Sequence, residues 1–162
     1  MPFKWLINIL FRKFKPHPIE KTFKYHFKNK DYLTQALTHR SKVSNPKKNY
    51  ERLEFFGDAV IDIVISKFLM KEFPMGDEGL LTQKRSGLVQ KQFLGFIGNH
   101  LNLVSYLSID SAVNLTDEKV SIRQSANLFE ALIGAMYLDG GLNPCQRIIK
   151  ETIWKHKKEA WK

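Results

Sequence analysis

The segment from residue 51 to residue 65 restricts the fold more than any other part of the chain. It reads ERLEFFGDAVIDIVI, with carboxylates at positions i, i+3, i+7 and i+11. At about 100° per residue, these positions fall within an arc of roughly 80° on an α-helix. Most of the remaining surface is apolar, which is typical of a buried helix. The segment therefore predicts a buried helix with one acidic face, formed by Glu51, Glu54, Asp58 and Asp62.

This acidic face has two interpretations. A solvated or salt-bridged face is the commoner reason for acids in a row. Within the segment, however, Arg52 is the sole basic residue, and it lies about 100° round the helix from Glu51. Neighbouring like charges on a helix repel one another, and a divalent cation would relieve that repulsion. Mg²⁺ takes oxygen ligands and keeps positions for water and phosphate, so the pattern favours a cation site.

A second apolar segment, residues 125–137, carries further oxygen-bearing side chains. Asn127 and Glu130 are three residues apart and so share a face of the expected helix. Gly134 lies about one turn beyond Glu130, where the absence of a side chain lets another helix approach. Glu130 has an alternative role as a core acid paired with an arginine or a hydroxyl. The acidic face of residues 51–62 favours the functional role, because the two segments together form a matching cluster.

The remaining patterns predict an all-α fold. Helical spacing of apolar residues occupies residues 30–37, 50–73, 79–100, 122–139 and 144–158. No sustained alternation typical of strands is present, and residues 105–121 are expected to form loops and short turns. The single cysteine, Cys145, excludes an intrachain disulfide and fits a reducing compartment such as the cytoplasm. No apolar run approaches the roughly 20 residues of a membrane span.

The distribution of charge indicates the partner. The net charge is +10, from 26 Lys and Arg and 16 Asp and Glu. Residues 20–50 contain eight basic residues and two acids, whereas residues 51–78 contain seven acids and three basic residues. Basic flanks can hold a nucleic acid through its phosphates, and a divalent ion can activate water against a phosphodiester. The sequence therefore predicts metal-dependent hydrolysis of nucleic acid.

Residues 1–18 are interpreted as a basic, apolar appendage to a domain that spans residues 19–162. Three roles are open to it: a helix packed on the domain, a helix at a membrane surface, or a targeting peptide. The apolar stretch lacks a small-residue cleavage site, and the segment has no serine and one arginine. These features favour the packed or loosely attached helix.

Residues 51–60, ERLEFFGDAV, resemble the signature of the ribonuclease III family, and the resemblance extends over about residues 20–160. Matching stretches include THRS at 38–41, FP at 73–74, DEG at 77–79, TQKRS at 82–86 and FEALIGA at 129–135. The resemblance implies a ribonuclease III-like helical endonuclease domain that works as a two-fold homodimer. It also implies cleavage of double-stranded RNA, including ribosomal RNA precursors, with Mg²⁺ or with Mn²⁺ in its place.

The resemblance also assigns roles to individual residues. The expected metal ligands are Glu54, Asp58, Asn127 and Glu130. The expected catalytic residues are Glu51, Glu54, Asp58 and Glu130. Glu78 matches a supporting acid near the dimer interface, and Phe55 matches an aromatic residue that packs into the partner subunit. Candidate RNA contacts are Lys47, Lys48, Lys84 and Arg85.

Two departures from the family pattern affect the expected function. Asn127 stands where the family usually has an aspartate; its carbonyl oxygen can still ligate, but the lost charge is expected to weaken metal binding. Typical bacterial members also carry a C-terminal domain that binds double-stranded RNA, whereas this sequence stops at Lys162. RNA binding is then expected from the domain's own basic residues or from an RNA-binding partner.

The departures leave alternative functions open. One is a non-catalytic RNA-binding or ribosome-associated protein of the same fold, favoured by Asn127 and opposed by the five retained acids. Another is a membrane-surface protein that uses residues 1–15, which leaves the acidic face unexplained.

Overall fold

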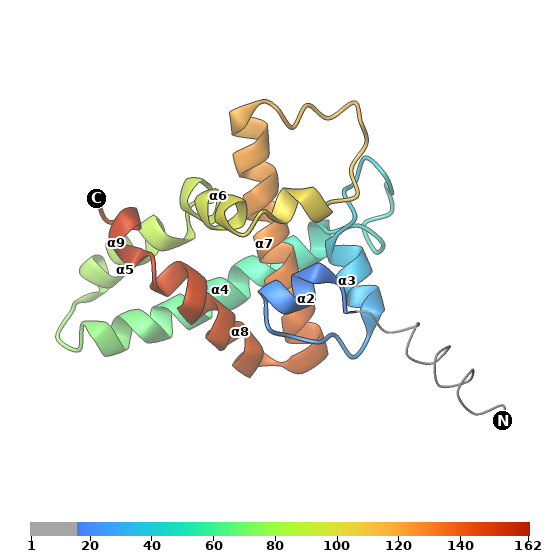
Figure 1. The fold of residues 1–162 in the computed structure, drawn as a ribbon. Coiled ribbons are helices and arrows are strands. Elements are labelled where there is room, and N and C mark those ends of the chain that lie inside the picture. Colours follow the sequence, from blue (N-terminus) through green and yellow to red (C-terminus); the bar gives the residue numbers. More distant parts are fainter. Residues whose placement is uncertain (1–15) are drawn as a thin grey trace, which may run out of the picture.

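The computed structural model describes residues 16–162, and these residues form a helical domain (Figure 1). Two short helices, α2 (Pro18–Thr22) and α3 (Lys30–Ala36), precede the long helix α4 (Glu51–Glu72). Next come α5 (Glu78–Val89), α6 (Lys91–His100), the 3₁₀ helix η1 (Leu103–Tyr106) and the second long helix, α7 (Glu118–Gly140). The chain ends with α8 (Leu142–Ile149), the π-helical turn η2 (Lys150–Trp154) and α9 (Lys157–Ala160).

The all-α prediction is confirmed for this part of the chain, where β structure is confined to one isolated bridge between Thr38 and Ser108. The role of the N-terminal appendage stays a prediction, because residues 1–15 lie outside the described residues. Pro18, at the expected domain boundary, is the first residue of α2. None of the helices within residues 16–162 has the length and apolar character needed to cross a membrane.

The two long helices α4 and α7 cross at the centre of the domain (Figure 1). Their backbones touch there: a β-carbon on Gly134 would lie 2.2 Å from the carbonyl oxygen of Leu53. The close approach predicted at Gly134 is therefore confirmed. On α7 every residue from Leu128 to Met136 is buried, so the glutamate within this run, Glu130, is held in the core beside α4.

The helix expected over residues 79–100 is two helices, and this part of the prediction was wrong. Gln90, between α5 and α6, has the extended backbone angles φ −63° and ψ 144°. After this break α6 packs tightly on α7: a β-carbon on Gly95 would lie 2.6 Å from the carbonyl oxygen of Ile122, and one on Gly98 would lie 2.5 Å from that of Ser125. Tertiary packing thus overrides the continuous helical pattern and makes Lys91 the first residue of α6.

Other helix boundaries also shifted. The helix α4 ends before Pro74, as expected. In contrast, α7 begins at Glu118, four residues earlier than predicted, because the Asp117 side chain caps it by accepting from the backbone N–H groups of Lys119 and Val120. The helix predicted over residues 144–158 is divided among α8, η2 and α9.

Candidate functional site

The ammonium group of Lys91 connects the three helices that meet at the centre of the domain. Its Nζ donates to Glu54 Oε1 at 3.0 Å, to Asn127 Oδ1 at 2.8 Å and to Glu130 Oε2 at 2.5 Å. An ammonium has three N–H donors, and all three have an oxygen acceptor here. Three of the four predicted metal ligands therefore converge on one cation, which the chain itself supplies. We call this group of four residues the cation cluster.

Burial shapes the electrostatics of the cation cluster. Glu130 is 1% exposed, and its desolvation raises the pKa of the carboxyl to about 7, against the opposing effect of Lys91 and with a further contribution from the charges of Glu54 and Asp58. Burial alone would lower the pKa of Lys91, but its hydrogen bonds to Glu130 and Glu54 and their charges raise it. The ammonium is therefore charged at neutral pH.

Asn127 is oriented by a chain of hydrogen bonds. Its Nδ2 donates to the Tyr50 hydroxyl at 3.4 Å, and that hydroxyl donates to Gln124 Oε1 at 2.8 Å. Because the amide nitrogen is directed toward Tyr50, the amide oxygen is directed toward Lys91. The side chain thus presents the one atom that can act as a ligand to the centre of the cation cluster.

Asp58 is the predicted ligand that does not contact Lys91. It is exposed on α4 one turn after Glu54, near enough for its charge to raise the pKa of Glu130. Among residues 16–162, no group of three or more His, Cys, Asp and Glu side chains is arranged to hold a metal ion. The donor chemistry nevertheless fits Mg²⁺, which prefers carboxylate and carbonyl oxygens.

The other acids of the α4 face meet different partners. Glu51 accepts a hydrogen bond from Arg40 Nη1 at 3.3 Å. Asp62 is half-buried, and its Oδ1 has no hydrogen-bond partner among the described residues; burial raises its pKa and the charge of Arg85 opposes that rise. The sequence indicated that the acidic face lacks basic partners, and this is true of the residues of α4 itself. Arg40 and Lys91, which pair with acids of this face, come from other segments of the chain.

A groove of about 740 Å³ opens beside the cation cluster. Its lining includes Glu51, Glu54 and Asn127 together with two arginines, Arg40 and Arg123. Arginine side chains bind phosphate groups with paired N–H donors, so the groove offers phosphate contacts next to the cluster. The sequence analysis did not predict Lys91, Arg123 and Tyr50 as parts of this site. Their polar or basic side chains are the only signal in the sequence that could have suggested them.

His39 has a structural role at the edge of the groove. It is buried, and its Nδ1 accepts from the backbone N–H of Ser41 at 3.0 Å. Burial lowers the pKa of the imidazole, so the ring is neutral at physiological pH.

Glu78 lies away from the cation cluster within one chain. It begins α5 and accepts a hydrogen bond from the Thr82 hydroxyl at 2.9 Å. A cavity of about 380 Å³ separates it from the C-terminal half of α4, where Leu69 and Met70 form the opposite wall. One chain alone therefore does not bring this predicted supporting acid to the other four.

The predicted RNA contacts fall into two pairs. Lys84 has its Nζ 4.6 Å from the ring centroid of Trp161, and Arg85 donates to the Ser66 hydroxyl at 3.0 Å. Both side chains are half-buried and engaged in intramolecular contacts. Lys47 and Lys48 are exposed in the loop before α4, which leaves their charges accessible to a polyanion.

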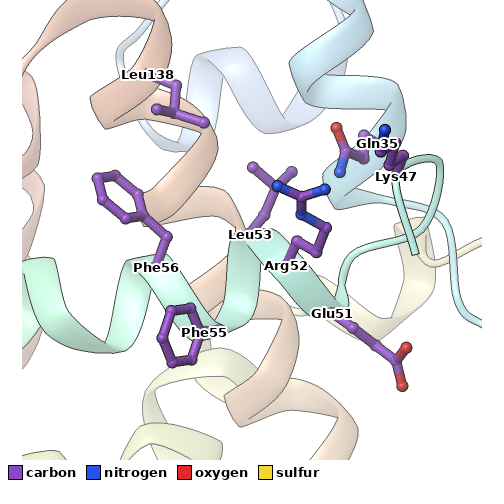
Figure 2. Close-up of a pocket in the computed structure, with 8 residues that line it drawn as sticks. All are labelled: Gln35, Lys47, Glu51, Arg52, Leu53, Phe55, Phe56 and Leu138. Atoms are coloured by element: carbon purple, nitrogen blue, oxygen red, sulfur yellow. The ribbon is translucent and has the colours of Figure 1, made fainter.

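Phe55 is 82% exposed, although it lies between the buried residues Leu53 and Gly57 on α4. Ile63 and Met70, eight and fifteen residues further along α4, are 60% and 65% exposed. Helical geometry places these three residues within an arc of about 80°. Figure 2 shows Phe55 and Phe56 leaving α4 in different directions, with Phe56 on the side of Leu138. A pocket of about 580 Å³ lies beside them and is lined by Leu53, Phe55, Phe56 and Leu138, among others.

Together, the fold and the cation cluster define a helical domain whose two central helices present acidic and amide oxygens to a single cation. Residues 29–157 match the family model described as Ribonuclease-III-like. The chain belongs to this family, as the sequence resemblance predicted.

Individual relatives agree with this assignment. The chain is 44% identical over 140 residues to ribonuclease 3 of Ehrlichia canis (strain Jake), a match that covers 85% of this chain and 62% of that protein. It is 38% identical over 130 residues to ribonuclease 3 of Sulfurovum sp. (strain NBC37-1), covering 80% of this chain and 57% of that protein. The chain thus spans less than two thirds of the length of these relatives.

A solved structure extends the comparison to the fold. The nuclease domain of ribonuclease III from Campylobacter jejuni superposes with a TM-score of 0.78 at 35% sequence identity. The match covers 85% of this chain and 94% of that chain. The similarity therefore spans nearly the whole of a nuclease domain.

Proposed function

We propose that this protein is a metal-dependent endoribonuclease that hydrolyses phosphodiester bonds in double-stranded RNA. The observation that carries the proposal is the convergence of Glu54, Asn127 and Glu130 on one cation, in a domain whose relatives include ribonucleases 3. Duplex RNA as the substrate, the processing of RNA such as ribosomal precursors, and a cytoplasmic location belong to the same proposal and rest on the family resemblance.

The proposed metal ligands are Glu54, Asp58, Asn127 and Glu130, and the proposed metal is Mg²⁺ or Mn²⁺. A bound divalent ion activates water as the nucleophile and stabilises the leaving oxygen. The residues of this chain orient the ligands and the substrate. Tyr50 holds the Asn127 amide, and burial holds Glu130 in one place.

The groove would receive the RNA backbone. Arg40 and Arg123 line it beside Glu51 and Glu54, so a phosphate bound by the arginines would lie next to the acids that hold the metal. Lys47 and Lys48, exposed before α4, would add sequence-independent attraction to the duplex. A separate RNA-binding partner would strengthen this contact.

We further propose a two-fold homodimer along α4. The exposed Phe55 lies beside a pocket of about 580 Å³ whose lining combines Leu53, Phe56 and Leu138 with polar and charged side chains. An exposed aromatic residue next to a pocket on the same face can form a self-complementary interface. The Campylobacter jejuni domain is described as having a region involved in dimer formation. A two-fold axis perpendicular to α4 and near its centre would place the two α4 helices antiparallel. Each would then carry its Glu78 end toward the other chain's Glu54, which supports Glu78 as an acid supplied across the interface.

One alternative has specific support. Lys91 stands in the cation position, and Asn127 is uncharged, so the site attracts a divalent ion less than a site of four carboxylates would. Both observations favour an RNA-binding or ribosome-associated protein with weak or no catalysis.

A cleavage assay separates the two functions. The full chain is incubated with a long RNA duplex and Mg²⁺ or Mn²⁺, beside the variant Glu130→Gln, which keeps the size of the side chain. We expect the native protein to cut the duplex and the variant to bind it without cutting. Binding without cleavage by the native protein, at every concentration of either ion, would establish the alternative.

A further inference from the structure

We infer that Lys91 is an internal counter-ion that holds the metal position of this site and must leave it before a divalent ion can bind. The inference rests on the proposed metal site and concerns how that site is regulated. Its consequence is a site that holds the Lys91 ammonium when metal is scarce and holds a divalent ion in its place when metal is abundant.

The distances in the cation cluster make the two cations mutually exclusive. The ammonium nitrogen lies between 2.5 and 3.0 Å from oxygens of Glu54, Asn127 and Glu130. Mg²⁺ binds its oxygen ligands at roughly 2.0–2.1 Å, so an ion held by these three oxygens would occupy nearly the same volume as the ammonium. Repulsion between the two positive charges adds to the steric conflict.

The charges in the cluster show why Lys91 is stable there without metal. Glu54 and Glu130 together carry two negative charges when ionised, and Asn127 carries none. The single positive charge of Lys91 offsets one of them and satisfies the buried Glu130, whose carboxylate would otherwise be a costly unpaired charge in the core. The uncharged Asn127 and the positive Lys91 act in the same direction, since each lowers the attraction of the site for a divalent ion.

The position of Lys91 in the fold allows its side chain to leave. The backbone is anchored, because α6 packs against α7 in backbone contact at Gly95 and Gly98. The side chain itself is 50% exposed and carries a flexible stem. An ammonium displaced from the cluster would stay at the surface near the groove, where it is free to contact a phosphate.

The test measures metal binding without RNA and therefore does not depend on cleavage. Binding of Mn²⁺ alone is followed by electron paramagnetic resonance for the native chain, for Lys91→Met and for Lys119→Met. The control removes the same charge from an exposed position at the start of α7. We expect Lys91→Met to bind Mn²⁺ about tenfold more tightly than the native chain, and Lys119→Met to match the native chain. Equal affinity in all three, or no binding by Lys91→Met, would overturn the inference.

Thermal unfolding supplies a second readout and guards against a folding defect. Without metal, Lys91→Met should melt at a lower temperature than the native chain, because Glu130 loses its partner. Added Mn²⁺ should raise its melting temperature by more than it raises that of the native chain. Lys91→Gln, which keeps an amide NH₂ as a donor and lacks the charge, should lie between the two, and it replaces Lys91→Met if that variant does not fold. An equal response to Mn²⁺ in the native chain and the variant would again contradict displacement.

The two proposals fail in distinguishable ways. If Lys91→Met binds Mn²⁺ more tightly yet neither it nor the native chain cuts duplex RNA, the nuclease proposal fails and the counter-ion role of Lys91 stands. If the native chain cuts RNA but binds Mn²⁺ as tightly as Lys91→Met does, the counter-ion role fails and the nuclease proposal stands.

Discussion

Gly57 of α4 lies against the backbone of Glu130 on α7, so closely that a β-carbon on Gly57 would come within 1.8 Å of the Glu130 carbonyl oxygen. This contact brings the turn of α4 that carries Glu54 next to the turn of α7 that carries Glu130. The spacing of the cation cluster is therefore set by a helix crossing that only glycine permits at this point.

Substitution of Gly57 should disrupt both the fold and the site. We expect Gly57→Ala to lower the free energy of unfolding by about 3 kcal/mol, because two backbones must move apart to admit the methyl group. Denaturation by urea measures the change. Gly79→Ala is the matched control, since its nearest neighbour would lie 3.6 Å away and the change should stay within about 1 kcal/mol. Equal stability of the two variants would contradict the close crossing.

The raised pKa of Glu130 predicts a specific dependence of stability on pH. The pKa is raised from 4.5 to about 7, so the unfolded chain releases this proton at lower pH than the folded one does. The contribution of the protonated Glu130 to the free energy of unfolding is therefore fully present below about pH 4.5, and it is lost as the pH rises toward 7. It amounts to about 3–4 kcal/mol at most, from about 1.4 kcal/mol for each pH unit between 4.5 and about 7.

Urea unfolding of the native chain and of Glu130→Gln between pH 4.5 and 7.5 checks this. The stability of the native chain should fall relative to that of the variant across this range, because glutamine does not titrate. Two curves that stay parallel would show that folding does not raise the pKa of Glu130.

Restoring a carboxylate at position 127 should strengthen metal binding. We expect Asn127→Asp to lower the Mg²⁺ concentration for half-maximal cleavage by about tenfold, because a fourth carboxylate joins Glu54, Asp58 and Glu130 around the ion. Asn127→Ala is the contrasting variant: it removes the ligating oxygen and the hydrogen bond to Tyr50, and cleavage should fall. A titration of duplex cleavage with Mg²⁺ measures both, and an unchanged midpoint in Asn127→Asp would exclude position 127 as a ligand.

The proposed dimer depends on the exposed apolar face of α4. Phe55→Glu should convert the dimer to a monomer, because the apolar contact of the Phe55 ring is lost and a carboxylate would have to be desolvated in the interface. Sedimentation velocity measures the change in mass. Phe96→Glu changes a different exposed aromatic residue, on α6, and should leave the dimer intact. A native chain that sediments as a monomer at all concentrations would contradict the interface.

The sequence by itself determined the helical class of the fold, the acidic face of α4 and the contact at Gly134. These features are local. Helical periodicity can be recognised within one or two turns of sequence, and a glycine within an apolar helix indicates a place where another helix can approach closely. The ligand candidates Glu54, Asn127 and Glu130 were found for the same reason, since the resemblance to a family lies in contiguous stretches of residues.

The tertiary structure alone decided which cation occupies the cluster and how the acids are neutralised. Lys91 and Arg40 lie 37 and 11 residues from their partners Glu54 and Glu51, and no local pattern pairs residues so distant. Lys91 reaches the cluster because the helix predicted over residues 79–100 breaks at Gln90, and that break follows from the packing of α6 on α7. Side-chain convergence of this kind depends on how the helices cross, which is a property of the packed core and not of any single segment.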